Sequence, residues 1–138
     1  MNKLSFVFLI CAIAMISADR PDWYPEDEAA VEAKCREENN VSAETVTKTW
    51  ANEVEDTPEL RKFLLCLSEN KHLYHADTGF KADRLQYVLK EKSKLNCKDD
   101  FVEGCVNAAK DVKPDEALVF DVTKCVVAGA KEHCENVE

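Results

Sequence analysis

The sequence predicts an all-α fold of about six short helices that are cross-linked by disulfides. Apolar residues recur at helical spacing through most of the chain, and no segment alternates as a half-buried strand would. The chain has three glycines, too few for the many turns of a β-sandwich. Six cysteines follow residue 19, and an even number of cysteines in a small secreted chain is typical of a disulfide framework.

Residues 1–18 are predicted to be a cleaved secretory signal. Lys3 provides a short positive start, residues 4–16 are almost wholly apolar, and Ser17 begins a small-residue cleavage site. Because the apolar run is short for a membrane span and charged residues follow at once, cleavage is favoured over a membrane anchor. Residues 19–138 are then expected to form one secreted, extracellular domain without stable membrane insertion.

The formal net charge of −9 bears on the partners of the protein. An acidic surface repels the phosphates of nucleic acids and the anionic lipids of membranes. Nucleic acid is therefore excluded as a partner, and a neutral or apolar ligand, or another protein, is expected instead.

The helices expected in the N-terminal half begin with capping residues or acids. They cover residues 26–39, residues 43–52 and a segment that starts at Pro58. Ser42 and Thr57 are the predicted N-caps. Ser42 also completes a glycosylation sequon at Asn40, and the two roles do not exclude each other. Residues 19–25 are expected to form an extended arm, from which Trp23 packs back on the body.

The C-terminal half contains a turn signal and three further helix candidates. The turn is predicted at residues 77–79, which read Asp-Thr-Gly. One helix is expected over residues 81–95, a second begins at Asp99, and a third follows Pro114. Gly129 is expected to loosen the end of the last helix.

The cysteines of the last two helices can be paired by position. If the two helices run antiparallel, Cys105 faces Cys125 and Cys97 faces Cys134. The second bridge requires the last helix to end or distort within residues 129–134, because nine residues turn a helix through half a circle. Six cysteines formally allow fifteen pairings. Zinc is a competing interpretation, but no Cys-x2-Cys pair occurs.

No catalytic constellation is found in the sequence. Nucleophilic Cys/His catalysis needs a free thiolate, and six paired cysteines leave none. The pairs Glu37-Glu38 and Asp99-Asp100 are interpreted as solvated faces or helix starts rather than as an acid and a base. We therefore expect no enzyme activity, no cofactor and no metal.

The order of cysteines and turns matches a known family. Cys66-Leu-Ser-Glu-Asn precedes a turn that ends in Gly79-Phe80, and a helix follows from Ala82. Cys35 lies upstream, and Cys105 and Cys125 lie downstream. In this arrangement the mature chain resembles the insect odorant-binding proteins, also called the pheromone-binding or general odorant-binding family.

The resemblance implies a disulfide pairing with one bridge absent. Cys35 takes the family's first position and Cys66 its third, and these two pair in the family. The second and fifth positions fall on Lys62 and Glu116, so the bridge between them is missing at both ends, which is the family's minus-C pattern. Lys62 and Glu116 are hypothesised to form an ion pair or to be independent surface residues. Cys134, with its partner Cys97, is additional to the pattern.

The resemblance also implies a non-catalytic carrier of a small apolar ligand such as an odorant, a pheromone or a fatty acid, with a chemosensory receptor as one candidate target. The ligand would lie in a cavity between the helices. The inward helical faces suggest as ligand-binding candidates Val46, Trp50, Phe63, Leu67, Leu73, Tyr74, Phe80, Leu85, Leu89, Phe101, Val119 and Phe120. Each of them could instead belong to a packed core. Tyr74, Tyr87 or Thr123 could bind a polar head of the ligand.

Three alternatives stay open at this point. A salivary or haemolymph scavenger on the same fold would be favoured by an acidic cavity residue that contacts an amine. A small helical signalling protein would be favoured by a solid interior. A saposin-like lipid protein fits poorly in cysteine spacing and length. His72 and His75 are either a pH-sensitive release device or plain exposed residues.

Overall fold

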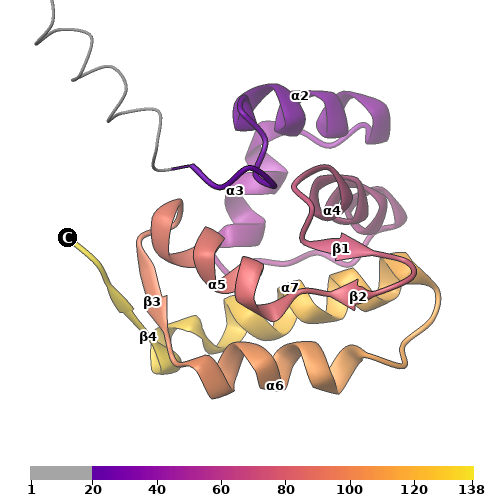
Figure 1. Ribbon diagram of the computed structural model, residues 1–138. Helices are drawn as coiled ribbons and strands as arrows, with labels where there is room; N and C mark the ends of the chain where they lie inside the picture. The colour runs from indigo at the N-terminus through magenta and orange to yellow at the C-terminus, as the bar shows by residue number, and fades with distance from the viewer. Residues whose placement is uncertain (1–19) are drawn as a thin grey trace, which may run out of the picture.

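A computed structural model describes residues 20–138, which form six helices and two small antiparallel sheets. The signal predicted for residues 1–18 lies outside the described residues. The elements, labelled as in Figure 1, are α2 (Glu28–Asn39), α3 (Ala43–Trp50), α4 (Pro58–Asn70), β1 (Tyr74–His75), β2 (Gly79–Phe80), α5 (Ala82–Glu91), β3 (Leu95–Cys97), α6 (Asp99–Ala109), α7 (Asp115–His133) and β4 (Cys134–Asn136). The all-α prediction is confirmed, although four very short strands are present. None of the helices in residues 20–138 is long and apolar enough to span a bilayer.

The predicted N-caps are confirmed by hydrogen bonds from backbone amides to the capping side chains. The Thr45 amide donates to the Ser42 hydroxyl at 3.1 Å, and the Leu60 amide donates to the Thr57 hydroxyl at 3.1 Å. Each bond satisfies an amide that the first turn of a helix leaves without a partner. Asp27 caps α2 in the same way, so the first helix begins two residues later than expected.

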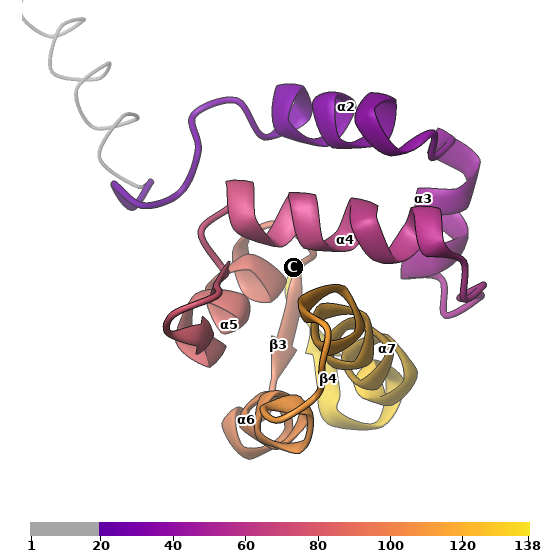
Figure 2. The same ribbon diagram turned by 90° about the vertical axis from the view of Figure 1, so that its right-hand side faces the viewer.

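The helices pack in a stack. Figure 2 shows α2 above α4, with α7 and then α6 below it. Each neighbouring pair in this order is in contact: α2 with α4, α4 with α7, and α7 with α6. The α5 helix lies beside the stack and contacts β3 and α6. This packing places α4, α5 and α7 around a common region of the interior, where a ligand site can form.

The helix predicted over residues 81–95 is shorter than expected. It ends at Glu91, and Lys94 takes a positive φ of 56°, which reverses the chain into β3. The last strand, β4, pairs with β3 so that Cys97 lies opposite Cys134. The helix α7 ends at His133, within the interval that the Cys97–Cys134 bridge requires. Cys97 is thus a strand residue, and its bridge joins two strands rather than two helices.

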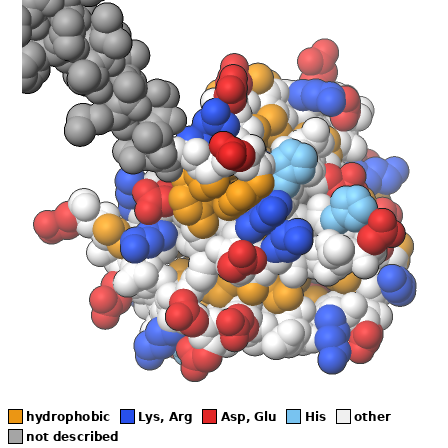
Figure 3. Space-filling view, viewed as in Figure 1, with side chains coloured by type: hydrophobic (Ala, Val, Ile, Leu, Met, Phe, Trp, Pro, Cys, Tyr) orange, Lys and Arg blue, Asp and Glu red, His pale blue; other side chains and the backbone are white. Residues whose placement is uncertain are grey.

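The segment before α2 folds back on the body instead of extending. The Tyr24 amide donates to the Pro21 carbonyl at 3.1 Å, which closes a turn. The Trp23 ring packs edge-on against Tyr87 at 5.4 Å, and the Arg84 guanidinium lies 4.7 Å from the Trp23 ring centre. The packing of Trp23 is therefore as predicted. Figure 3 shows apolar side chains gathered on the surface where this segment meets the body.

Gly129 has a different role from the one expected. It lies inside α7, and a Cβ atom at this position would lie 2.5 Å from the Phe101 ring. The absence of a side chain lets the Phe101 ring approach the helix and stack on His133, with ring centres 4.6 Å apart. Gly129 thus brings α6 close to α7 and does not loosen the helix.

The three predicted disulfides are all present. Cys35–Cys66 joins α2 to α4, Cys105–Cys125 joins α6 to α7, and Cys97–Cys134 joins β3 to β4. Lys62 and Glu116 do not form the hypothesised ion pair in the part of the chain that the structure describes. Lys62 is exposed, which agrees with the alternative of an independent surface residue.

The interior contains two separate apolar clusters. The larger cluster includes Phe63 and Val119 and fills the space between α2, α3, α4 and α7. The smaller cluster includes Leu89, Val102 and Val126 and lies between α5, α6 and α7. Leu85 is partly buried and packs against both clusters, so it lies at the boundary between them.

Candidate functional site

An apolar cavity of about 390 Å³ lies between the two core clusters. Its lining includes Leu64, Leu67 and Val122 from the larger cluster and Leu89 and Val126 from the smaller one. Further lining comes from α2, α3, β2 and β3. The last two helices contribute unequally: α7 forms one wall of the cavity, whereas α6 contributes no lining residue.

Three helices each present one continuous face to the cavity. The residues on these faces follow the spacing i, i+3, i+4 and i+7. In α4 and α5, the residue at i+7 lies just beyond the last residue of the helix. They are Leu64, Leu67, Ser68 and Lys71 from α4; Leu85, Val88, Leu89 and Lys92 from α5; and Thr123, Val126, Val127 and Ala130 from α7. Residues at this spacing lie on one side of a helix, so each helix contributes a strip of side chains to the cavity wall.

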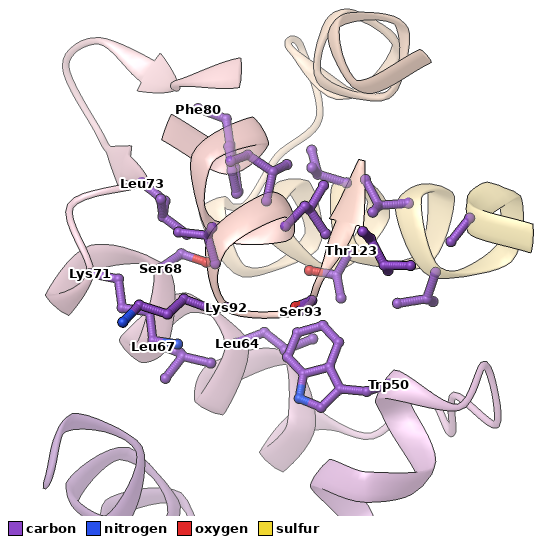
Figure 4. Close-up of a pocket in the computed structure, with 18 of the residues that line it drawn as sticks. Trp50, Leu64, Leu67, Ser68, Lys71, Leu73, Phe80, Lys92, Ser93 and Thr123 are labelled. Carbon is purple, nitrogen blue, oxygen red and sulfur yellow. The ribbon is translucent and has the colours of Figure 1, made fainter. Parts of the chain in front are cut away.

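The lining is mainly aliphatic and contains three hydroxyl groups. The Thr123 hydroxyl donates to the Val119 carbonyl at 2.9 Å and is therefore satisfied by its own helix. Ser68 is 7% exposed, and its hydroxyl oxygen points toward the cavity in Figure 4. No hydrogen bond joins this hydroxyl to another group within residues 20–138. Ser68 is thus a polar group inside an apolar space that is free to bind a ligand.

Three charged residues meet at one end of the cavity, and we call Glu28, Lys71 and Lys92 the charged cluster. The Lys71 ammonium donates to Glu28 Oε1 at 2.9 Å, and the Lys92 ammonium lies 3.7 Å from Glu28 Oε2. Figure 4 shows Lys71 and Lys92 extending to the same end, with Trp50 on another side of the cavity. Both lysines are C-cap residues, where a cation is favoured by the helix dipole.

Tyr24 packs against the charged cluster from the N-terminal segment. The Lys92 ammonium lies 5.1 Å from the centre of its ring, within the range of a cation–π contact. The Tyr24 hydroxyl is buried near Glu28, although the geometry falls short of a hydrogen bond. Burial first, and then the nearby Glu28 carboxylate, raise the pKa of Tyr24. Tyr24 therefore stays neutral and covers the cluster on one side.

The lysines keep Glu28 ionised despite its partial burial. Burial by itself would raise the pKa of this carboxyl, but the hydrogen bond and charge of Lys71, with smaller contributions from Tyr24 and Lys92, lower the pKa below its ordinary value of 4.5. The charged cluster therefore holds one carboxylate and two ammonium groups at neutral pH.

We expect the Glu28→Gln variant to show a weaker loss of stability in acid than the wild-type protein. Because the pKa of Glu28 is lowered on folding, its charge stabilises the fold at pH values above 4.5, and this contribution is lost as the pH falls through the lowered pKa. The free energy of unfolding, measured by urea titration between pH 7 and pH 3, should fall less steeply in Glu28→Gln. Glu37→Gln, on the exposed side of the same helix, is the control. Equal slopes in wild type and Glu28→Gln would contradict this prediction.

The structure divides the twelve predicted ligand-binding residues into two groups. Six line the cavity: Trp50, Leu67, Leu73, Phe80, Leu85 and Leu89. The other six lie elsewhere: Val46, Phe63, Tyr74, Phe101, Val119 and Phe120. Five of these six are core residues, and Phe101 packs between α6 and α7. Contact with a ligand stays a prediction for all twelve.

The polar candidates are also divided. Thr123 lines the cavity, whereas Tyr87 packs in the aromatic contact with Trp23. Tyr74 is turned away from the cavity toward Asp115: burial, followed by the interaction with that carboxylate, raises the pKa of Tyr74 to about 12. His72 and His75 are exposed and do not line the cavity.

None of the three residues of the charged cluster is among the ligand-binding candidates predicted from the sequence. Lys71 and Lys92 each follow an apolar helical face by one turn, and this spacing was the available signal. Glu28 comes from a different helix, and nothing in the local sequence indicates that it meets the two lysines. Among the described residues, no group of His, Cys, Asp and Glu side chains is arranged to hold a metal ion.

The fold and the cavity together define a class of protein. Short helices joined by disulfides surround an apolar space, so the chain is a small cross-linked helical protein with an internal site. The chain belongs to the PBP/GOBP family, which matches residues 22–128. The resemblance seen in the sequence is therefore confirmed at the level of the family, while the minus-C assignment stays a prediction.

Two relatives from Tenebrio molitor are similar to this chain. The B1 protein and the B2 protein are each 31% identical to it over 100 residues. The matched part is 69% of this chain, 72% of the B1 protein and 73% of the B2 protein. No solved structure gives a significant match. Members of the PBP/GOBP family are binding and carrier proteins rather than enzymes.

Proposed function

We propose that this protein is an extracellular carrier that holds a small apolar molecule in the cavity and keeps it in aqueous solution until it is released, with a chemosensory receptor as one candidate target. The cavity carries this proposal. Its volume of about 390 Å³ lies within the range of known ligand sites, about 300–1,000 Å³. Removal of apolar ligand surface from water supplies about 25 cal/mol per Å² before the costs of association.

The other candidate functions are less well supported by the interior of the protein. A helical signalling protein has no need of an internal apolar space, whereas this chain has one between its two core clusters. A scavenger of amines would use a free carboxylate in the cavity. Glu28 is already paired with Lys71 and Lys92, and Glu32 lies 3.9 Å from the Arg36 guanidinium.

We expect Ala130→Phe to lower the affinity for a neutral apolar ligand by about tenfold or more, which is about 1.4 kcal/mol or more. Ala130 lines the cavity from α7, so a phenyl ring at this position takes up space that the ligand would fill. The measurement is binding of the fluorescent probe N-phenyl-1-naphthylamine and its displacement by 1-decanol.

Ala128→Phe is the matched control, because Ala128 lies exposed on the same helix and does not line the cavity. It adds the same ring outside the site and should leave the affinity unchanged. Equal affinities in wild type and Ala130→Phe, both shown by circular dichroism to be folded, would place the bound probe outside the cavity and contradict the proposed site.

A further inference from the structure

The charged cluster carries an excess of positive charge. Two ammonium groups, from Lys71 and Lys92, face a single carboxylate, that of Glu28. The nearest other acid of the lining, Glu32, is offset by Arg36 at 3.9 Å. Although the protein has a net charge of −9, one end of its cavity therefore carries an excess of one positive charge.

Lys71 has donors that the protein does not use. Its side chain is 10% exposed, so water reaches it poorly. An ammonium group has three N–H donors, and Lys71 makes one hydrogen bond within residues 20–138, to Glu28. A buried cation with free donors favours a further acceptor, because an unsatisfied charged group is costly in a medium of low dielectric constant.

The sign of the charge discriminates between ligand heads. An anionic head would balance the excess ammonium group, and the Lys92 side chain, which is 39% exposed, would turn from Glu28 and Tyr24 toward it. A cationic head would instead add a third positive charge beside two lysines. Charges a few ångströms apart interact strongly where water is partly excluded, so the anion is favoured over the amine.

Two apolar helical faces of the cavity lead to the charged cluster. On α4, Lys71 follows Leu64, Leu67 and Ser68 along one face, and on α5 Lys92 follows Leu85, Val88 and Leu89. A chain that lies along these faces ends at the two lysines, and the unpaired Ser68 hydroxyl is one turn away on α4.

We propose that the cavity selects apolar ligands that carry a carboxylate head, and that Lys71 and Lys92 bind this head while Glu28 competes with it. This inference rests on the proposed carrier function and assigns the chemical class of the ligand. Glu28 acts as an internal anion that holds the two lysines in place when no carboxylate is bound.

The test compares three ligands that share one chain and differ in the head: sodium decanoate, 1-decanol and decylamine. Affinities are measured by isothermal titration calorimetry at pH 7.5 and low salt. We expect decanoate to bind most tightly and decylamine most weakly, and we expect the preference for decanoate to shrink as salt screens the charges.

Two variants with opposite expected effects locate the head. Lys92→Met should lower the affinity for decanoate about tenfold, as expected for the loss of one interaction with a charged group, and change the affinity for 1-decanol much less. Glu28→Gln should raise the affinity for decanoate, because the competing carboxylate is gone. Lys90→Met and Glu37→Gln make the same changes of charge at exposed positions outside the cavity and should change neither affinity.

The possible results separate this inference from the carrier function. If 1-decanol binds as tightly as decanoate, or if Lys92→Met weakens both ligands equally, the carboxylate class is wrong and the carrier function stands. Tightest binding of decylamine would assign the opposite class of ligand and would also overturn the inference. If none of the three ligands binds, the carrier function fails and this inference fails with it.

Discussion

Phe63→Ala is expected to lower the free energy of unfolding by about 3–5 kcal/mol. Phe63 lies on α4 and is 1% exposed, in the larger core cluster where α2, α3, α4 and α7 meet. Truncation removes the apolar surface of the ring and leaves a void that closely packed helices fill poorly. The measurement is urea denaturation followed by circular dichroism.

Leu65→Ala is the control on the same helix, because Leu65 is only partly buried and should cost much less. A loss below about 1 kcal/mol for Phe63→Ala would contradict the packing described for the core.

The conservative Phe63→Leu keeps the fold and tests the ligand contact predicted from the sequence. Because Phe63 does not line the cavity, the Phe63→Leu variant should bind 1-decanol with the same affinity as the wild-type protein.

Replacing both Cys35 and Cys66 by serine is expected to cost about 3–4 kcal/mol of stability. The bridge joins residues 31 positions apart, so its loss releases a long loop in the unfolded chain. It also removes the covalent link between α2 and α4, which carry Glu28 and the face that leads to Lys71. Both cysteines are replaced so that no free thiol remains.

The Cys97/Cys134 double serine variant provides the comparison. This bridge closes a loop of similar length, with a sequence separation of 37, but it joins β3 to β4 and not α2 to α4. We expect a similar loss of stability and a smaller change in the affinity for decanoate than in the variant without the Cys35–Cys66 bridge. A stability loss below about 1 kcal/mol on removal of Cys35–Cys66 would show that the helices hold α2 without the bridge.

The starts of the helices were predictable because their causes are local. The hydroxyls of Ser42 and Thr57 each accept a hydrogen bond from an amide three residues ahead, and proline at residue 58 suits a first helical position. The end of α5 was not predictable in this way. The apolar spacing continues to Leu95, but Leu95 pairs with Asn136 at the far end of the chain.

The cavity was predictable in part. Helical spacing identifies apolar faces, and six of the twelve predicted residues lie on the faces that line the cavity. It does not tell which apolar face meets another helix and which remains open. Phe63 and Leu64 are neighbours on α4, yet Leu64 lines the cavity and Phe63 does not, because successive residues point about 100° apart around a helix.

By itself, the sequence determined the class of the fold, the helix caps and the family, because periodicity, capping hydroxyls and cysteine order act within a few turns of the chain or can be compared position by position. The tertiary structure decided where the space between the clusters lies and that Glu28 meets Lys71 and Lys92 beside it. These three residues come from α2, from the end of α4 and from the end of α5. Their encounter depends on how whole helices pack, and no local pattern of residues contains that information.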